Sequence, residues 1–139
     1  MTNAPGRMFL LVVGILYIVF AGIGLIGAIP MLLSASYWDA ILPATLPWAV
    51  WYGFAALVGL YELFMGIMGV KNRNDLSKAS FLRTLGFVSI ALVVLSAIIG
   101  FTMFSGVFGG GVAIFTLIFG LILPVLYVIG AMKNMQASS

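Results

Sequence analysis

Hydrophobic residues dominate four long runs of the chain, and the polar and charged residues gather between the runs. The runs extend over about Met8–Ile29, Pro47–Val70, Phe81–Phe104 and Gly111–Met132. Each is long enough to cross the hydrocarbon core of a bilayer, which takes ~20 residues of α-helix. A transmembrane β-strand would instead alternate apolar and polar residues over ~10-residue segments. Because these runs are apolar on all sides, they predict transmembrane helices.

The three connections between the runs differ in character. Residues 30–46 are mostly apolar and are bounded by prolines, which predicts a short helix that lies in the membrane interface. Residues 71–80, KNRNDLSKAS, predict a short charged turn, and residues 105–110, SGVFGG, predict a tight glycine-rich turn. The first run exceeds the ~7–15 apolar residues of a signal peptide. We therefore expect it to be a retained span.

Short links between four spans predict one membrane domain over residues 1–139. The expected fold class is an all-α integral membrane protein, an up-down-up-down, left-handed bundle of four transmembrane helices. A faint internal repeat is also present, because IMGVKN ends the second run and IGAMKN ends the fourth. Two hairpins of the same topology would form a parallel repeat about an axis along the membrane normal.

Composition supports the membrane class and limits the chemistry. The chain is 64% hydrophobic and 6% charged, with a mean hydropathy of +1.29, whereas soluble domains are commonly ~25% charged. It contains no cysteine and no histidine, which excludes disulfides, thiol redox chemistry and histidine- or thiolate-based metal sites. Three acidic residues in all argue against a carboxylate metal cage. We expect no cofactor, no metal and no enzymatic activity.

The basic residues report how the chain is oriented in the membrane. All six lie on the side that holds both termini and the turn at residues 71–80, and the other side carries only Asp39. The positive-inside rule then places both termini in the cytoplasm, in a multi-pass protein of the cell (inner) membrane. The six can also contact anionic lipid headgroups. They are Arg7, Lys71, Arg73, Lys78, Arg83 and Lys133. Their scatter predicts the lipid bilayer, and no nucleic acid, as partner.

Small residues form stripes along one side of each predicted helix. In the second run, alternating steps of four and three give Ala55, Gly59, Glu62, Gly66 and Gly69. Small side chains let helix backbones approach closely, which favours helix association in membranes. Similar stripes occur in the first and third runs. The predicted packing glycines are Gly24, Gly59, Gly66, Gly69 and Gly86.

Glu62 is an acid inside an apolar run. It lies eight residues before Val70, about 12 Å from the cytoplasmic end of the helix at 1.5 Å per residue. The same count brings Tyr17 and Ser89 to a similar depth. Pro124 joins them there, because proline lacks an N–H and releases the carbonyl of the residue four positions earlier. These groups predict an intramembrane polar site, in which Glu62 bonds to Tyr17 or Ser89 directly or through one water.

Two classes of function fit this pattern. The first is a non-enzymatic protein that acts through helix association, as a homo-oligomer or as an accessory subunit of a larger membrane complex. The alternative is an oligomeric proton- or cation-coupled small transporter or channel that uses Glu62, since ionisable groups at membrane depth often mark transport paths. A lipid-modifying enzyme, with Glu62 and Tyr17 as its acid–base pair, is a third hypothesis.

The pattern Glu62-x3-Gly66-x2-Gly69, followed by a basic turn, resembles the second span of small bacterial four-span proteins such as the DoxX group. The resemblance covers this span and the turn after it. It implies a four-span membrane protein and assigns no role to any residue.

Overall fold

The structure is a computed structural model that describes residues 4–42, 47–108 and 111–138. In these ranges the regular secondary structure is entirely helical. The elements are α1 (Arg7–Leu33), α2 (Ala35–Ile41), α3 (Trp48–Lys71), the 3₁₀ turn η1 (Leu76–Lys78), α4 (Ala79–Phe108), α5 (Gly111–Gly120) and α6 (Ile122–Ser138).

Four helical segments are long and apolar enough to cross a membrane. They are Arg7–Leu33, Trp48–Lys71, Leu76–Thr102 and Leu117–Ala137. Many of the large apolar side chains on these segments are exposed, as expected where lipid rather than water surrounds a helix. The chain is an all-helical multi-pass membrane protein, as the apolar runs predicted.

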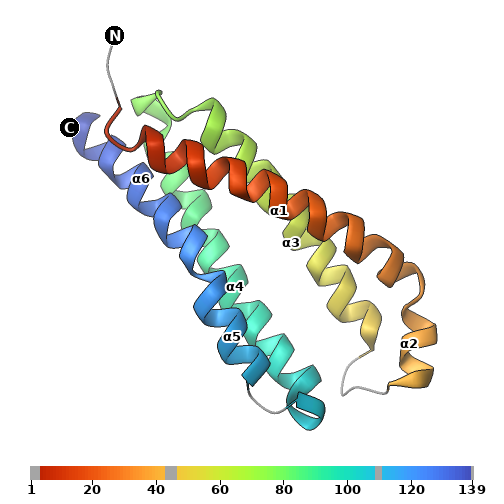
Figure 1. Cartoon of the computed structure of the whole chain (residues 1–139). Helices are drawn as coiled ribbons and strands as arrows, with labels where there is room; N and C mark the ends of the chain where they lie inside the picture. Colours follow the sequence, from red (N-terminus) through yellow and green to blue (C-terminus); the bar gives the residue numbers. More distant parts are fainter. Residues whose placement is uncertain (1–3, 43–46, 109–110, 139) are drawn as a thin grey trace.

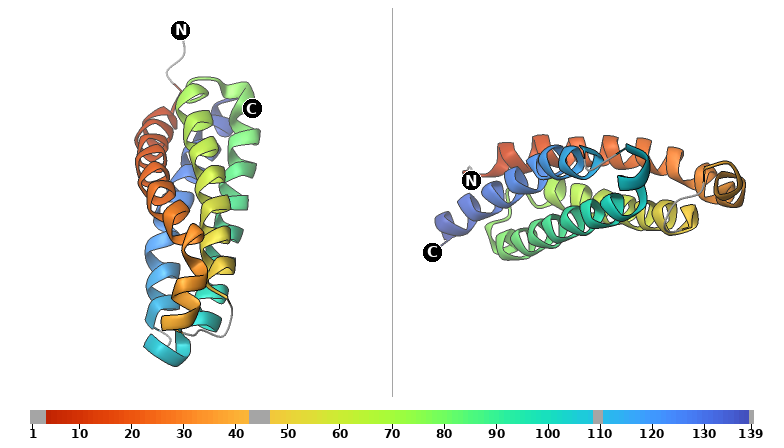
Figure 2. Two further views of the ribbon diagram at one scale, coloured as in Figure 1. Left: turned by 90° about the vertical axis from the view of Figure 1, so that its right-hand side faces the viewer. Right: turned by 90° about the horizontal axis from the view of Figure 1, so that it is seen from below.

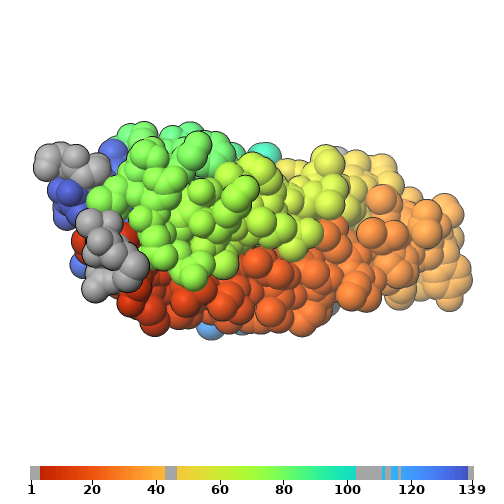
Figure 3. All heavy atoms as spheres, turned by 90° about the horizontal axis from the view of Figure 1, so that it is seen from above, coloured from red at the N-terminus to blue at the C-terminus, as the bar shows by residue number. Residues whose placement is uncertain are grey.

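The long helices lie side by side along one axis (Figures 1 and 2). Both chain ends and the α3–α4 connection lie at one end of the molecule, which we call the terminal end, and α2 lies at the opposite end (Figure 1). Helices α1 and α3 pack together along their length and form one continuous face (Figure 3). Helix α4 packs against α5 and α6. The two groups are close at the terminal end and diverge toward α2 (Figure 1).

The main hydrophobic core follows from this divergence, because all four long helices meet only toward the terminal end. Its buried residues come from α1, α3, α4 and α6. They are Leu10, Val13, Tyr17, Met65, Leu82, Leu85, Tyr127 and Ala131.

At the opposite end, aromatic side chains pack α2 against the start of α3. Trp48 at the start of α3 stacks on Tyr52, with ring centroids 5.7 Å apart. Its indole N–H donates to the carbonyl oxygen of Leu42 at 2.7 Å, and its backbone N–H donates to Asp39 Oδ1 at 2.9 Å. These bonds fasten α2 to the first turn of α3. The segment at residues 30–46 therefore contains the expected short helix, although residues 43–46 lie outside the described ranges.

Two helices are longer than the sequence predicted. Helix α1 continues past Ile29 and through Pro30 to Leu33. Proline lacks the N–H that would donate to the carbonyl of Ile26, and the helix nevertheless continues to Leu33. Helix α4 continues to Phe108, so residues 105–108 are helical and the prediction of a turn at these positions is wrong. Residues 109–110 of the same predicted turn lie outside the described ranges.

The sequence predicted one continuous helix for the fourth run, but the structure has two helices there. It is interrupted at Leu121, between α5 and α6, and α6 extends beyond Met132. Pro124 has no N–H to donate to the carbonyl of Gly120, and glycine itself weakens a helix. Backbone bonds resume immediately, from Leu121 N to Leu117 O and from Val125 N to Leu121 O. The run is thus interrupted three residues before the proline that the sequence singled out.

Candidate intramembrane polar site

Tyr17 and Ser89, two members of the predicted polar layer, contact each other. Tyr17 on α1 and Ser89 on α4 are both buried, and their hydroxyl oxygens are 3.2 Å apart. Within the described ranges neither is hydrogen-bonded to Glu62, so the expected bond from the carboxyl to one of these hydroxyls is not formed. The two hydroxyls satisfy one another across the α1–α4 interface.

Two further tyrosines complete this layer, and the sequence analysis did not assign them to it. Tyr61 on α3 donates to the carbonyl oxygen of Leu85 on α4 at 2.6 Å. Tyr127 on α6 donates to the carbonyl oxygen of Met65 on α3 at 2.8 Å, and its ring lies edge-on to that of Tyr17, 6.1 Å away. The sequence did hold a signal for both tyrosines, because a phenolic O–H that is buried in an apolar run usually needs a hydrogen-bond acceptor. Together the three tyrosines link all four long helices.

Pro124 is fully buried beside this core, in the first turn of α6. Its predicted effect on the backbone is consistent with the interruption one turn earlier. It offers no polar side-chain atom to the layer.

Glu62 lies in a cavity of about 210 Å³ between α1, α3 and α4. Most of the described lining residues are apolar or aromatic, and Ser96 contributes a hydroxyl group. The lining residues are Phe20, Ala21, Gly24, Trp51, Phe54, Ala55, Val58, Gly59, Glu62 and Ser96. No residue in the described part of the chain forms a hydrogen bond or ion pair with the carboxyl group. Glu62 therefore faces the other helices, as its stripe predicted, and lines the cavity between them.

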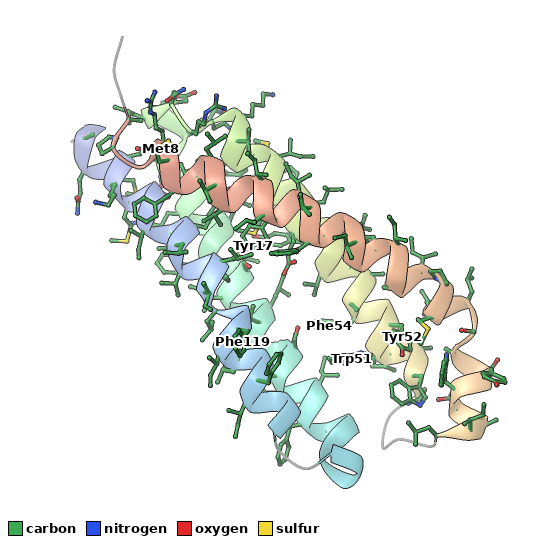
Figure 4. All side chains as sticks on the ribbon, in the orientation of Figure 1. Met8, Tyr17, Trp51, Tyr52, Phe54 and Phe119 are labelled. Atoms are coloured by element: carbon green, nitrogen blue, oxygen red, sulfur yellow. The ribbon has the colours of Figure 1, made fainter. Side chains whose placement is uncertain are left out.

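The cavity begins where the tyrosine layer ends. Ala21 is one helical turn beyond Tyr17, and Ser96 is two turns beyond Ser89, both toward the α2 end. Figure 4 shows Tyr17, Trp51 and Phe54 between the α1–α3 pair and the α4–α6 group. The hydrogen-bonded layer thus separates Glu62 from the terminal end, while the diverging helices leave room on its other side.

Four of the five predicted packing glycines have a neighbouring helix against them. A methyl group added at any of the four would meet another helix within 3.1 Å. The nearest atoms are Leu25 Cγ for Gly59 at 3.1 Å, Gly14 O for Gly66 at 2.8 Å, Tyr127 Cε2 for Gly69 at 2.8 Å and Val128 Cγ2 for Gly86 at 2.5 Å. At Gly24 nothing lies within 4 Å, so the prediction that Gly24 packs against a helix is wrong. It lines the cavity instead.

The basic residues keep their one-sided distribution in the folded chain. Arg7 begins α1, Lys71 ends α3, and Lys133 lies near the end of α6, all at the terminal end (Figure 1). The remaining three belong to the α3–α4 connection or the start of α4. They are Arg73, Lys78 and Arg83. Arg73 donates to the carbonyl oxygen of Val70 at 2.6 Å, which caps α3.

In the same connection, Asp75 accepts hydrogen bonds from the backbone N–H and the hydroxyl of Ser77. These bonds lower the pKa of its carboxyl group. Asp75 is therefore fixed as a turn residue, outside the apolar segments.

Asn134 is a fully buried polar residue that the sequence analysis missed. Its Oδ1 accepts from the backbone N–H of Gly6 at 2.7 Å, and its Nδ2 donates to the carbonyl oxygen of Arg73 at 3.0 Å. It thus joins the N-terminal segment, the α3–α4 connection and α6. Asn72, the matching residue of the IMGVKN and IGAMKN pair, is also buried and bonds to Met68 of its own helix. The Lys-Asn ending that the two runs share was the sequence feature that could have pointed to these asparagines.

The described residues offer no group of three histidine, cysteine or acidic side chains that could hold a metal ion. No family model matches the chain, and no curated protein or solved structure is significantly similar to it. The case for a function therefore rests on the chemistry of the Glu62 cavity.

Proposed function

We propose that this chain is a small, non-enzymatic membrane protein that carries a proton or a cation past Glu62, as a transporter or channel. One observation supports this most strongly. A carboxyl group with no hydrogen-bond or ion-pair partner in the described part of the chain lines a cavity between helices that cross the membrane. Such groups are costly at this depth and commonly mark ion and proton pathways.

Comparison with the tyrosine layer favours transport over a purely structural role for Glu62. The hydrogen bonds that join the helices come from Tyr17, Tyr61 and Tyr127. An ionisable side chain near the centre of a membrane helix costs roughly 2.5–3.5 kcal/mol on insertion scales. Glu62 offsets none of that cost with a bond in the described structure. A site that exchanges a proton or cation gives this carboxyl group a role that interhelical bonding does not.

The proposal includes an orientation in the membrane. The four spans run up-down-up-down as a left-handed bundle in the inner membrane, with both termini and the α3–α4 connection in the cytoplasm and α2 outside. The charge distribution supports this, because the basic residues gather at the terminal end whereas α2 carries Asp39. Glu62 then lies on the cavity side of a layer that faces the cytoplasm.

Association with a second copy, or with a larger membrane complex, is the second candidate. It is favoured by the glycines of α1 that no helix of this chain covers. Added methyl groups at Gly22 and Gly27 would meet nothing within 4 Å, and uncovered glycines let another helix approach closely. A mass measurement in native lipid would give the oligomeric state directly, and a strictly monomeric protein would remove this candidate.

Flux into proteoliposomes tests the transport proposal. Purified protein is reconstituted, and proton, Na⁺ and K⁺ gradients are applied one at a time. We expect flux above protein-free vesicles, abolished by Glu62→Gln and retained in part by Glu62→Asp, which keeps the carboxyl group. Asp75→Asn is the matched control, because it removes one carboxyl charge outside the apolar segments and should leave flux unchanged.

Wild-type protein that passes none of these three ions, and no organic cation either, would overturn the transport proposal. Flux that survives Glu62→Gln unchanged would overturn the role of Glu62.

A further inference from the structure

Three aromatic residues are among those that line the cavity that holds Glu62. Phe20 contributes from α1, and Trp51 and Phe54 contribute from α3; Figure 4 shows the latter two between the helix groups. The faces of aromatic rings attract cations, and most of all bulky, weakly hydrated ones such as quaternary ammonium groups. The cavity thus combines three aromatic rings with one carboxyl group.

The charge of the surroundings selects a positive ligand. No lysine or arginine is among the described residues that line the cavity. The basic residues lie at the terminal end, beyond the tyrosine layer. A cation entering the cavity would therefore be the ionic partner that the described structure does not give Glu62.

The small number of polar groups in the cavity favours an organic cation over an inorganic one. Ca²⁺ takes ~6–8 oxygen ligands and Mg²⁺ about six, whereas among the described residues of the lining Glu62 and Ser96 are the ones with side-chain oxygens. A bare metal ion would lose most of its hydration there without replacement. An alkylated ammonium ion needs few polar contacts, because its charge is spread over carbon groups that pack against aromatic faces.

The volume limits the size of the ligand. At about 210 Å³, the cavity is smaller than the ~300–1,000 Å³ pockets that hold drug-sized molecules. A small cation with one ring or a few alkyl groups fits this space better than a larger amphiphile.

We propose that this cavity binds a small hydrophobic organic cation, with its positive nitrogen against Glu62 and its hydrocarbon part against Phe20, Trp51 and Phe54. This inference rests on the proposed function and names the class of substrate. It assigns the three aromatic residues to a binding site rather than to packing.

The test uses benzyltrimethylammonium and the full chain in lipid nanodiscs, with binding measured by equilibrium dialysis. Neopentylbenzene, which has the same shape without the charge, is the matched ligand. We expect saturable binding of the cation and only non-saturable partitioning of the neutral compound. Glu62→Gln should weaken binding about tenfold or more, and Glu62→Asp should restore most of it.

Aromatic substitutions give an independent arm. Phe54→Leu should weaken binding about threefold or more through loss of a cation–π contact. Phe87→Leu is its control, because Phe87 is exposed on α4 and does not line the cavity. Circular dichroism of each variant verifies that the helices are retained.

Equal binding by wild type and a folded Glu62→Gln variant would overturn the inference, as would equal affinity for the neutral compound. Saturable, Glu62-dependent binding without any flux would support the site and contradict transport. Proton or Na⁺ flux that needs Glu62, with no binding of the organic cation, would contradict the site and leave the proposed function intact.

Discussion

The close approach of α1 and α3 predicts how much one added methyl group should destabilise the protein. At Gly66, a Cβ atom would lie 2.8 Å from the backbone oxygen of Gly14 and 3.0 Å from Tyr17 Cβ and Ile18 Cγ1. The oxygen belongs to the backbone of α1 and cannot rotate away. Gly66→Ala therefore forces the two helices apart, and overpacking of this kind typically costs about 1–3 kcal/mol of folding free energy.

A matched substitution separates this clash from the general effect of alanine in a helix. Gly27 on α1 is also helical, but a Cβ there would meet nothing within 4 Å. Both changes gain the same helix propensity, about 0.8–1 kcal/mol in water. The difference between Gly66→Ala and Gly27→Ala should thus be the clash alone, about 1–3 kcal/mol less stability for Gly66→Ala.

Reversible unfolding in mixed detergent micelles, titrated with sodium dodecyl sulfate and followed by tryptophan fluorescence, measures this difference. All three tryptophans, at positions 38, 48 and 51, lie toward the α2 end, so α1–α3 separation should alter their signal. A Gly66→Ala protein as stable as Gly27→Ala would refute the close packing of α1 on α3.

Two further predictions concern the terminal end and the orientation. Asn134→Ala should lower the unfolding free energy by about 1–3 kcal/mol, because two backbone groups lose their partner. In the same titration Asn72→Ala should cost less, since its bond lies within one helix; equal losses would contradict the bridging role. For orientation, single cysteines in this cysteine-free chain are labelled with an impermeant maleimide. Asn74→Cys and Ala137→Cys should react only after permeabilisation and Ala40→Cys in intact cells, so labelling at 74 in intact cells would reverse the topology.

The four membrane-spanning segments could be predicted from the sequence, because long apolar runs leave few alternatives in a membrane. The effect of each proline was harder to predict. Pro30 lies in the last turn of α1, and the helix continues through it to Leu33. Pro124 lies in the middle of a run, and the helix is interrupted three residues before it, at Leu121. The extent of each helix around its proline was known only from the structure.

The candidate site, too, could be predicted from the sequence only in part. The stripe of Glu62 and Gly66 indicated correctly that the acid faces other helices. Counting residues from the ends of the runs also placed Tyr17 and Ser89 at a similar depth, and the two are in contact. It could not show that their hydroxyls would pair with each other and leave the carboxyl group to a cavity. That outcome depends on the divergence of the helix groups toward α2, which also leaves Gly24 without a neighbour whereas Gly66 is tightly packed.

The most direct test of the account is the reactivity of Glu62 itself. Diisopropylcarbodiimide dissolves in membranes and adds covalently to protonated carboxyl groups, and peptide mass spectrometry locates the adduct. In proteoliposomes we expect modification at Glu62, strongly reduced by saturating benzyltrimethylammonium, with Asp39 and Asp75 unmodified. A Glu62 that never reacts, or that reacts equally with and without the cation, would contradict an accessible cation-binding carboxyl group inside the membrane.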